Sequence, residues 1–141
     1  MLEFETNLRV RYSEVDPSGF VYNGHYAAFY EVARTASIRS MGMSYKEIEE
    51  RGIVMPLIYQ NMRFYSPAFY DDLLTIKVKI TEMPTARITF QYEIYNEAGK
   101  KLNTGENALA FIDKTTQRPL RAPDWFIEVL QKEVNRVSNH K

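Results

Sequence analysis

A carboxylate in a tight turn directly ahead of a helix is the feature of this sequence best suited to chemistry. Residues 16–19 (DPSG) have Asp, Pro and Gly where a type I turn prefers them, and residues 20–22 (FVY) lead into Asn23, an expected helix start. Free backbone N–H groups at a helix start can bind an oxyanion. A carboxylate delivered there, Asp16, could act as a general base on water or as a nucleophile. This stretch could begin an acyl-transfer site; the alternative is that Asp16 is only a turn residue.

Other familiar catalytic arrangements are missing from the sequence. There is no cysteine, and the two histidines are His25 and His140, the latter in a polar tail. The absence of cysteine excludes thiolate metal sites and cysteine nucleophiles. Two isolated histidines without cysteine make a zinc site improbable. No G-x-S-x-G elbow, glycine-rich dinucleotide motif or P-loop occurs, and we expect neither metal nor cofactor. Glu14 is expected to be a solvated charge at a strand end.

The composition is that of an ordinary globular protein without a strong charge. The chain has 141 residues, 45% of them hydrophobic, with 18 basic and 18 acidic side chains. This balance gives no basic field for nucleic acid or for an anionic membrane surface. The N-terminus has no signal-peptide pattern, and no apolar run could span a bilayer. We therefore expect one domain over residues 1–141, in the cytoplasm, with no nucleic-acid partner and no membrane span.

Three helices are expected. Helical spacing over residues 23–41 places apolar side chains around most of the circumference, which argues for burial on several sides. Asn23 is its expected N-cap, and Gly42 is its expected stop. A capping-box spacing predicts a short helix over 44–51, and an amphipathic pattern predicts a last helix over 123–136.

Five strands are expected from apolar residues that alternate with period two. They cover residues 4–12, 57–65, 73–82, 86–96 and 101–112, with Leu8, Val10 and Tyr12 on one face of the first. Short links make the sheet largely antiparallel. A curved sheet around one helix would explain why that helix is so apolar. It would also leave a sheet edge exposed, which a second copy of the chain commonly covers.

The residues around Asp16 resemble a known family. The stretch over 16–23 (DPSGFVYN), with Tyr26 and then YEVARTASI from Tyr30, is similar to the signature of the hotdog-fold acyl-CoA thioesterases. The resemblance is closest to the group that contains 4-hydroxybenzoyl-CoA thioesterase and the Tol–Pal-associated acyl-CoA thioesterases. Residues 65–68 (YSPA) and 71–74 (DDLL) also resemble that family's strand–turn–strand, so the resemblance covers nearly the whole chain.

This resemblance implies an α+β hotdog fold, in which a curved antiparallel sheet of about five strands wraps around one long central helix. It implies a homodimer or homotetramer. Asp16 corresponds to the family's nucleophile or general base, and the backbone N–H of Asn23 to the group that polarises the thioester carbonyl. Close relatives often carry His or Tyr at the position of Asn23. Glu31 corresponds to a helix carboxylate that could position water; its alternative is a surface charge paired with Arg34.

The implied reaction is hydrolysis of an acyl-CoA or acyl-carrier thioester to a free acid and thiol. One alternative is a hydratase or dehydratase of the same fold, which would have to use His25 with Glu31 or Asp16. Another is a dimer that binds acyl thioesters without turnover. His25 is expected to make a neutral packing or polar contact. The basic residues that could hold CoA phosphates are expected to be solvated strand positions: Arg63, Lys77, Lys79 and Arg87.

Overall fold

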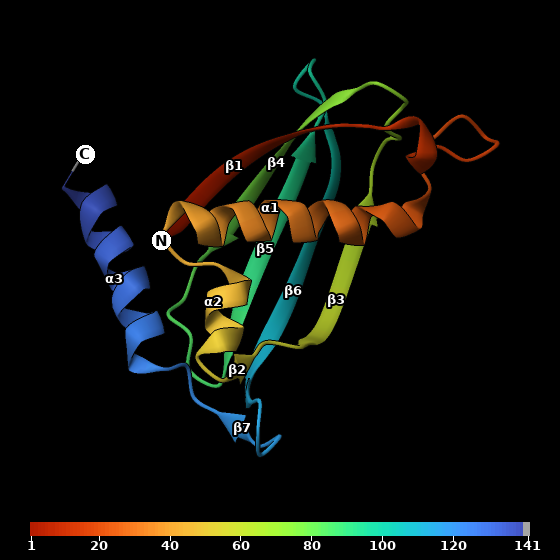
Figure 1. Cartoon of the computed structure of the whole chain (residues 1–141). Coiled ribbons are helices and arrows are strands. Elements are labelled where there is room, and N and C mark those ends of the chain that lie inside the picture. The colour runs from red at the N-terminus through yellow and green to blue at the C-terminus, as the bar shows by residue number, and fades with distance from the viewer. Residues whose placement is uncertain (140–141) are drawn as a thin grey trace.

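The computed structural model describes residues 1–139 and shows a curved sheet crossed by one long helix (Figure 1). His140 lies outside the described residues. In chain order the elements are β1 (Leu2–Arg9), the 3-10 turns η1 (Tyr12–Glu14) and η2 (Asn23–His25), α1 (Tyr26–Ser40), α2 (Tyr45–Glu50), β2 (Ile53–Val54), β3 (Leu57–Phe64), β4 (Leu73–Ile80), β5 (Arg87–Tyr95), β6 (Lys101–Asp113), β7 (Pro119–Leu120) and α3 (Asp124–Ser138).

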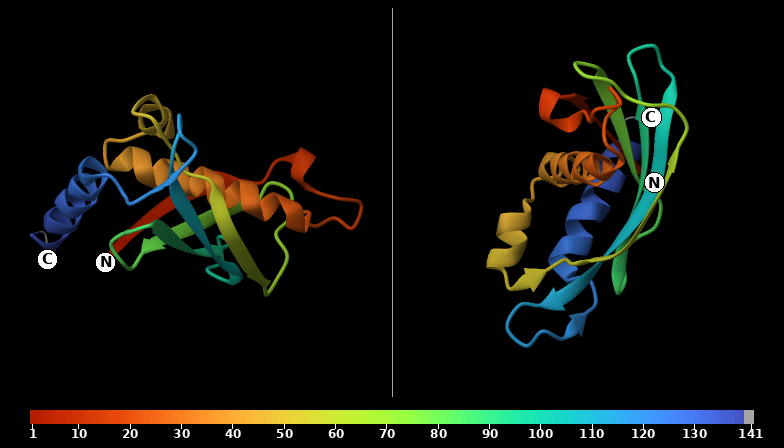
Figure 2. Two further views of the ribbon diagram at one scale, coloured as in Figure 1. Left: turned by 90° about the horizontal axis from the view of Figure 1, so that it is seen from below. Right: turned by 90° about the vertical axis from the view of Figure 1, so that its right-hand side faces the viewer.

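The five long strands form an antiparallel sheet in the order β1, β4, β5, β6, β3. The short strands β2 and β7, which the sequence did not predict, pair with the far end of β6. Two further views show α1 against the concave face of the sheet, with α3 beside one end of it (Figure 2). The predicted hotdog arrangement of one central helix and a wrapped antiparallel sheet is confirmed.

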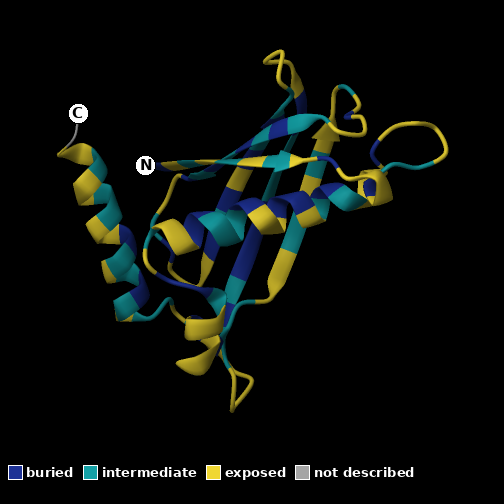
Figure 3. Ribbon diagram, turned by 45° about the horizontal axis from the view of Figure 1, so that its top comes forward, coloured by how far each residue is buried: buried dark blue, intermediate teal, exposed yellow. Residues whose placement is uncertain are grey.

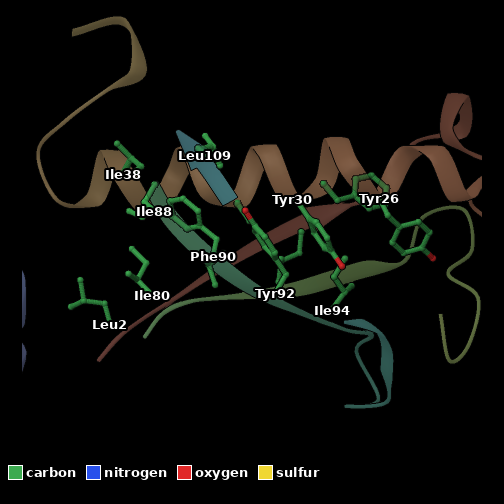
Figure 4. Close-up of a cluster of buried hydrophobic side chains, with 14 of the residues drawn as sticks. Leu2, Tyr26, Tyr30, Ile38, Ile80, Ile88, Phe90, Tyr92, Ile94 and Leu109 are labelled. Carbon is green, nitrogen blue, oxygen red and sulfur yellow. The ribbon is translucent and has the colours of Figure 1, made fainter. Parts of the chain in front are cut away.

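The core lies between α1 and the concave face of the sheet. Burial alternates along β4 and β5, so that one face of each strand is covered and the other is open (Figure 3). A close-up shows side chains of α1 packed against those of the strands, among them Tyr26, Tyr30, Tyr92 and Ile94 (Figure 4). Each aromatic ring removes a large apolar surface from water, which makes this layer the main source of stability.

The helix α1 is not buried on several sides in the single chain. Ala28 and Val32 are exposed, and Val32 keeps 47% of its surface accessible. The apolar character predicted for this helix is thus present, but the sheet of its own chain covers only one face. Within residues 1–139, none of the helices has both the length and the apolar character needed to cross a membrane.

Both ends of the first predicted strand differ from the structure. β1 begins at Leu2 and ends at Arg9, and Tyr12 belongs to the turn η1, where 78% of its surface is accessible. The expectation that Tyr12 lies on one face of this strand with Leu8 and Val10 is therefore wrong. The backbone N–H and C=O of Val10 still bond to Asp72 and Asp71, which continues the register of Arg9 with Leu73, and the chain turns away into η1 after that residue.

The start of the long helix was also predicted too early. α1 begins at Tyr26, and residues 23–25 form the separate 3-10 turn η2. Asn23 is not an N-cap: the cap position of α1 is His25, which makes no side-chain cap bond. The capping signal at α2 was correct, because the hydroxyl of Ser44 accepts the backbone N–H of Glu47 at 3.1 Å.

Gly105 on β6 is required by the close approach of α1. The Tyr30 hydroxyl donates to the side-chain oxygen of buried Asn103, and its ring stacks on Tyr92 with centroids 4.0 Å apart. A Cβ on Gly105 would contact the Tyr30 hydroxyl and lie 2.8 Å from the backbone oxygen of Asn61. Neither neighbour can move without disturbing the helix–sheet contact.

We expect Gly105→Ala to lower the free energy of unfolding by about 1–3 kcal/mol, the usual effect of overpacking a core. Urea titration of both proteins measures this difference. Thr104→Ala, a half-buried neighbour on the same strand, is the control and should change the unfolding midpoint less. An unchanged midpoint in Gly105→Ala would contradict the proposed tight contact.

Candidate active site

Asp16 lies in a small hairpin formed by residues 14–22, which we call the Asp16 hairpin. The N–H of Tyr22 donates to the carbonyl of Glu14 at 3.0 Å, and the N–H of Asp16 donates to the carbonyl of Phe20 at 3.0 Å. The N–H of Gly19 closes the tip on the carbonyl of Asp16 at 2.9 Å. Gly19 has φ +90, which glycine adopts without strain. The predicted DPSG turn is confirmed.

The carboxylate of Asp16 is half-buried and is partly engaged by its own turn. Its Oδ1 accepts the backbone N–H of Ser18 at 2.8 Å and also accepts the Ser18 hydroxyl. Its second oxygen, Oδ2, has no hydrogen-bond partner among residues 1–139. The turn therefore fixes the orientation of the carboxyl group and leaves one oxygen able to accept a proton or attack a carbonyl carbon.

The segment before α1 presents open backbone donors. The N–H of His25 bonds to the carbonyl of Tyr22 at 3.0 Å, whereas those of Asn23 and Gly24 have no partner within the described chain. They belong to the turn that precedes a 15-residue helix, where the helix dipole favours negative charge. Backbone donors at this place are suited to a developing oxyanion.

Asp16 and Asn23 line the same cleft, which has a volume of about 570 Å³. Its walls come from the Asp16 hairpin, from η2 and the start of α1, and from the end of β3 with the loop that follows it. The two sides are joined where the N–H of Val21 donates to the carbonyl of Ala68 at 2.9 Å. The structure thus brings together the two groups that the sequence predicted as base and oxyanion donor.

The cleft has an aromatic lining. Five rings contribute to its wall: Phe20, Tyr22, Tyr26, Phe64 and Tyr65. Tyr26 meets Phe64 edge to face, with ring centroids 5.0 Å apart. Burial raises the pKa of Tyr26 above its ordinary value, so its hydroxyl stays protonated at neutral pH.

Glu31 is not part of this cleft. It lies on the exposed side of α1, and no ion pair joins it to Arg34 within residues 1–139. The guanidinium of Arg34 instead donates to the hydroxyls of Tyr45 at 3.0 Å and Tyr92 at 3.3 Å. The alternative of a Glu31–Arg34 surface pair is therefore wrong, and a role for Glu31 in holding water stays a prediction.

The other candidates do not line the cleft. His25 packs against Tyr22 with ring centroids 5.9 Å apart, as expected for a packing contact. The four basic residues considered for CoA phosphates do not line the cleft; Lys77 pairs with Glu5 at 3.8 Å and Lys79 with Glu93 at 3.1 Å. A second hollow, of about 300 Å³ between α2 and α3, contains none of the predicted site residues.

Sequence reasoning missed the environment of Glu14. The side chain was expected to be solvated, but only 4% of the residue's surface is accessible. Its carboxylate accepts the backbone N–H of Arg11 at 2.7 Å. The one local signal was the three-residue spacing of Arg11 and Glu14, which fits a turn closed by a side chain. Burial itself depends on the packing of distant segments.

Comparison with known proteins assigns the family. A family model described as the thioesterase-like superfamily matches residues 10–130. The chain belongs to this superfamily. The fold and the match identify it as a hotdog-fold thioesterase, as the DPSGFVYN motif predicted.

Individual relatives agree with this assignment. The putative acyl-CoA thioesterase YneP of Bacillus subtilis is 30% identical over 122 residues, covering 84% of this chain and 88% of that protein. The acyl-CoA thioester hydrolase YbgC of Escherichia coli is 31% identical over 120 residues, covering 85% and 90%. A DHNA-CoA thioesterase structure from Staphylococcus aureus superposes with a TM-score of 0.88 at 32% identity, covering 100% of this chain and 97% of that one.

Proposed function

We propose that this thioesterase hydrolyses acyl-CoA thioesters to a free carboxylic acid and CoA, with Asp16 as the catalytic carboxylate. The observation that carries the proposal is that Asp16 lines the same cleft as Asn23, whose backbone N–H is open. The names of the two curated relatives, both acyl-CoA thioesterases, support the substrate class.

The chemistry follows from these groups. The thioester oxygen accepts the backbone N–H of Asn23, which polarises the carbonyl and stabilises the oxyanion that forms as it is attacked. Asp16 either takes a proton from the attacking water or attacks the carbonyl carbon itself, giving an anhydride that water then hydrolyses. In both routes the carbon–sulfur bond breaks, the CoA thiolate leaves and takes up a proton, and the carboxylic acid is released.

The two other functions are less well supported by the geometry. A hydratase or dehydratase needs an imidazole over the acyl chain, and His25 is packed on Tyr22 outside the cleft lining. A binding protein without turnover would need no free carboxylate oxygen beside open backbone donors. Incubation with an acyl-CoA panel separates the three, because the products are free CoA, hydrated acyl-CoA, or none.

The same panel tests the acyl group. Flat aromatic rings line the cleft, and such surfaces favour planar partners in stacked or edge-to-face contact. We propose an aromatic acyl group, and a relative of similar structure is named for DHNA-CoA. Benzoyl-CoA should then have a higher kcat/KM than hexanoyl-CoA or palmitoyl-CoA. A preference for palmitoyl-CoA would contradict the aromatic assignment but not hydrolysis. The matching acyl-carrier thioesters decide between CoA and carrier protein.

Asn23→Ala tests whether the oxyanion donor is the backbone. The variant keeps the N–H, and because the Asn23 side chain makes no cap bond, we expect both most of the turnover and the melting temperature to be retained. Steady-state hydrolysis and thermal melting measure the two quantities. A collapse of kcat with an unchanged melting temperature would show that the side-chain amide takes part in the reaction.

We also propose that the protein works as a homodimer, or as a homotetramer built from such dimers. β3 is an edge strand of the sheet, and its Leu57 and Ile58 leave about half of their surfaces accessible, 50% and 49%. The exposed apolar face of α1 around Val32 adds to this surface. A second copy that covers both would also bring its own Glu31 near the interface, where a water-holding role becomes testable.

A cytoplasmic location and a single domain over residues 1–141 stay predictions.

A further inference from the structure

Glu14 is a buried carboxylate that the proposed reaction does not use. Its residue is 4% exposed, and it does not line the cleft. Its Oε1 accepts the backbone N–H of Arg11 at 2.7 Å, and its Oε2 accepts from the Arg11 guanidinium at 3.3 Å. The first bond closes the turn η1 on itself, with the side chain reaching back three residues.

The backbone of Glu14 holds the first strand of the Asp16 hairpin. Its N–H donates to the carbonyl of Arg11 at 3.0 Å, and its carbonyl accepts the N–H of Tyr22 at 3.0 Å. Asp16 follows two residues after Glu14, and Asn23 follows directly after Tyr22. The backbone bond between Glu14 and Tyr22 therefore helps to set the positions of both the Asp16 carboxylate and the Asn23 N–H.

Further supports act on both strands of the hairpin. On the first, the N–H of Val15 donates to the carbonyl of Tyr12 at 3.2 Å, and the ring of Tyr12 meets that of Tyr70 with centroids 5.4 Å apart. Val21 bonds to Ala68 through the backbone, and the ring of Phe20 meets that of Phe69 with centroids 5.6 Å apart. These contacts attach residues 20–22 to the loop after β3. On the side of Asp16, the side-chain bond of Glu14 to the Arg11 N–H adds to the backbone bonds that close η1 and, unlike them, can be removed by substitution.

Fold stability alone is a poor reason for a charge at this place. Burying a carboxylate is costly, and its cation, Arg11, keeps 76% of its side chain exposed, so solvent screens the pair. A buried carboxylate with such a partner contributes little net stability. The length of the Glu14 side chain and the position of its acceptor oxygen instead bear on where the hairpin lies.

We infer that Glu14 is a positioning residue of the thioesterase reaction: it fixes the register between the Asp16 carboxylate and the Asn23 N–H. The inference rests on the proposed function. Since misplacing reacting groups by about 1 Å can cost about 100-fold in rate, loss of this support should act on kcat. KM should change little, because Glu14 does not touch the cleft.

Three substitutions of Glu14 separate the effect of its side-chain length from the effect of its negative charge. In Glu14→Ala the bond to Arg11 is lost, and we expect kcat to fall by about 10- to 100-fold with KM within about twofold. Glu14→Gln keeps the reach and the acceptor oxygen without the charge, and should restore kcat to near that of the unmodified protein. Glu14→Asp keeps the charge but is one methylene shorter, and should resemble the alanine variant. If Glu14→Ala does not fold, the Gln and Asp variants still decide the question.

Ser44→Ala is the matched control. It removes a buried side-chain acceptor from a backbone N–H at α2, away from the cleft, and should lower the melting temperature without changing kcat. A normal kcat in Glu14→Ala, an impaired Glu14→Gln, or an equal loss of kcat in Ser44→Ala would each overturn the inference. Asp16→Asn in the same assay distinguishes failure of the proposed function from failure of the inference about Glu14. If Asp16→Asn is active, the proposed function fails. If it is inactive while Glu14→Ala has a normal kcat, only the role of Glu14 fails.

Discussion

Asp16→Asn should reduce the turnover number for acyl-CoA hydrolysis by about 100- to 10,000-fold, the usual cost of losing a general base. The asparagine side chain has nearly the same shape, and its oxygen can still accept the Ser18 N–H that Asp16 accepts at 2.8 Å. The hairpin should therefore keep its form. The amide cannot take a proton from water or form an anhydride, so the chemical step should slow by this factor while substrate binding continues.

The matched control for this prediction is Asp113→Asn. Asp113 is also a turn aspartate, whose Oδ1 accepts the N–H groups of Thr115 and Thr116 at 2.9 Å, but it lies beside β7 and not in the cleft. It should keep normal turnover. The measurements are steady-state hydrolysis of a reactive acyl-CoA, equilibrium binding of that substrate, and thermal melting. Near-normal turnover in Asp16→Asn would show that Asp16 is only a turn residue and takes no part in catalysis.

The features that the sequence predicted are those set by local interactions. The DPSG turn depends on residues three positions apart, and the observed bond from Gly19 to Asp16 spans that interval. The same holds for the cap of α2, where Ser44 reaches Glu47. The alternation in β4 and β5 identified their buried faces because period two is a property of each strand by itself.

The features that it missed depend on contacts between distant segments. Asn23 has the residue type of an N-cap, but the residues before it are bonded to distant segments, Tyr22 to Glu14 and Val21 to Ala68. Residues 23–25 then form a 3-10 turn, and α1 begins only at Tyr26. Tertiary contacts thus override a local preference. The burial of Glu14 and the turn of Arg34 toward Tyr45 and Tyr92 have the same origin, since neither partner set can be read from spacing.

Part of the arrangement of the candidate site was predicted from the sequence, whereas the roles of its residues stay predictions. Asp16 and Asn23 could be paired beforehand because both belong to one contiguous motif, and the structure places them in one cleft. A role for Glu31 stays a prediction, because its side chain is exposed on α1 and lies outside the cleft. The difference is physical: one short stretch of chain joins the first pair, whereas a role for Glu31 depends on the second copy that we propose.

Disrupting the β3 edge should remove most of the activity together with the assembly. The cleft is open in a single chain, where the rings of Phe64 and Tyr65 at its wall remain 46% and 53% exposed. Water at the reacting carbonyl weakens every electrostatic contribution to catalysis, so a covering second copy would strengthen the action of the Asn23 N–H.

Ile58→Lys is the sharpest test, since a charge on an exposed edge strand opposes edge-to-edge pairing without touching the cleft. We expect the variant to sediment as a monomer and to have lost most of its turnover, while its melting curve stays cooperative. Thr81→Lys, also exposed but beyond the end of β4, is the control and should keep both the assembly and the rate. A fully active monomer would show that one chain supplies the complete site and that the apolar edge of β3 is not needed for catalysis.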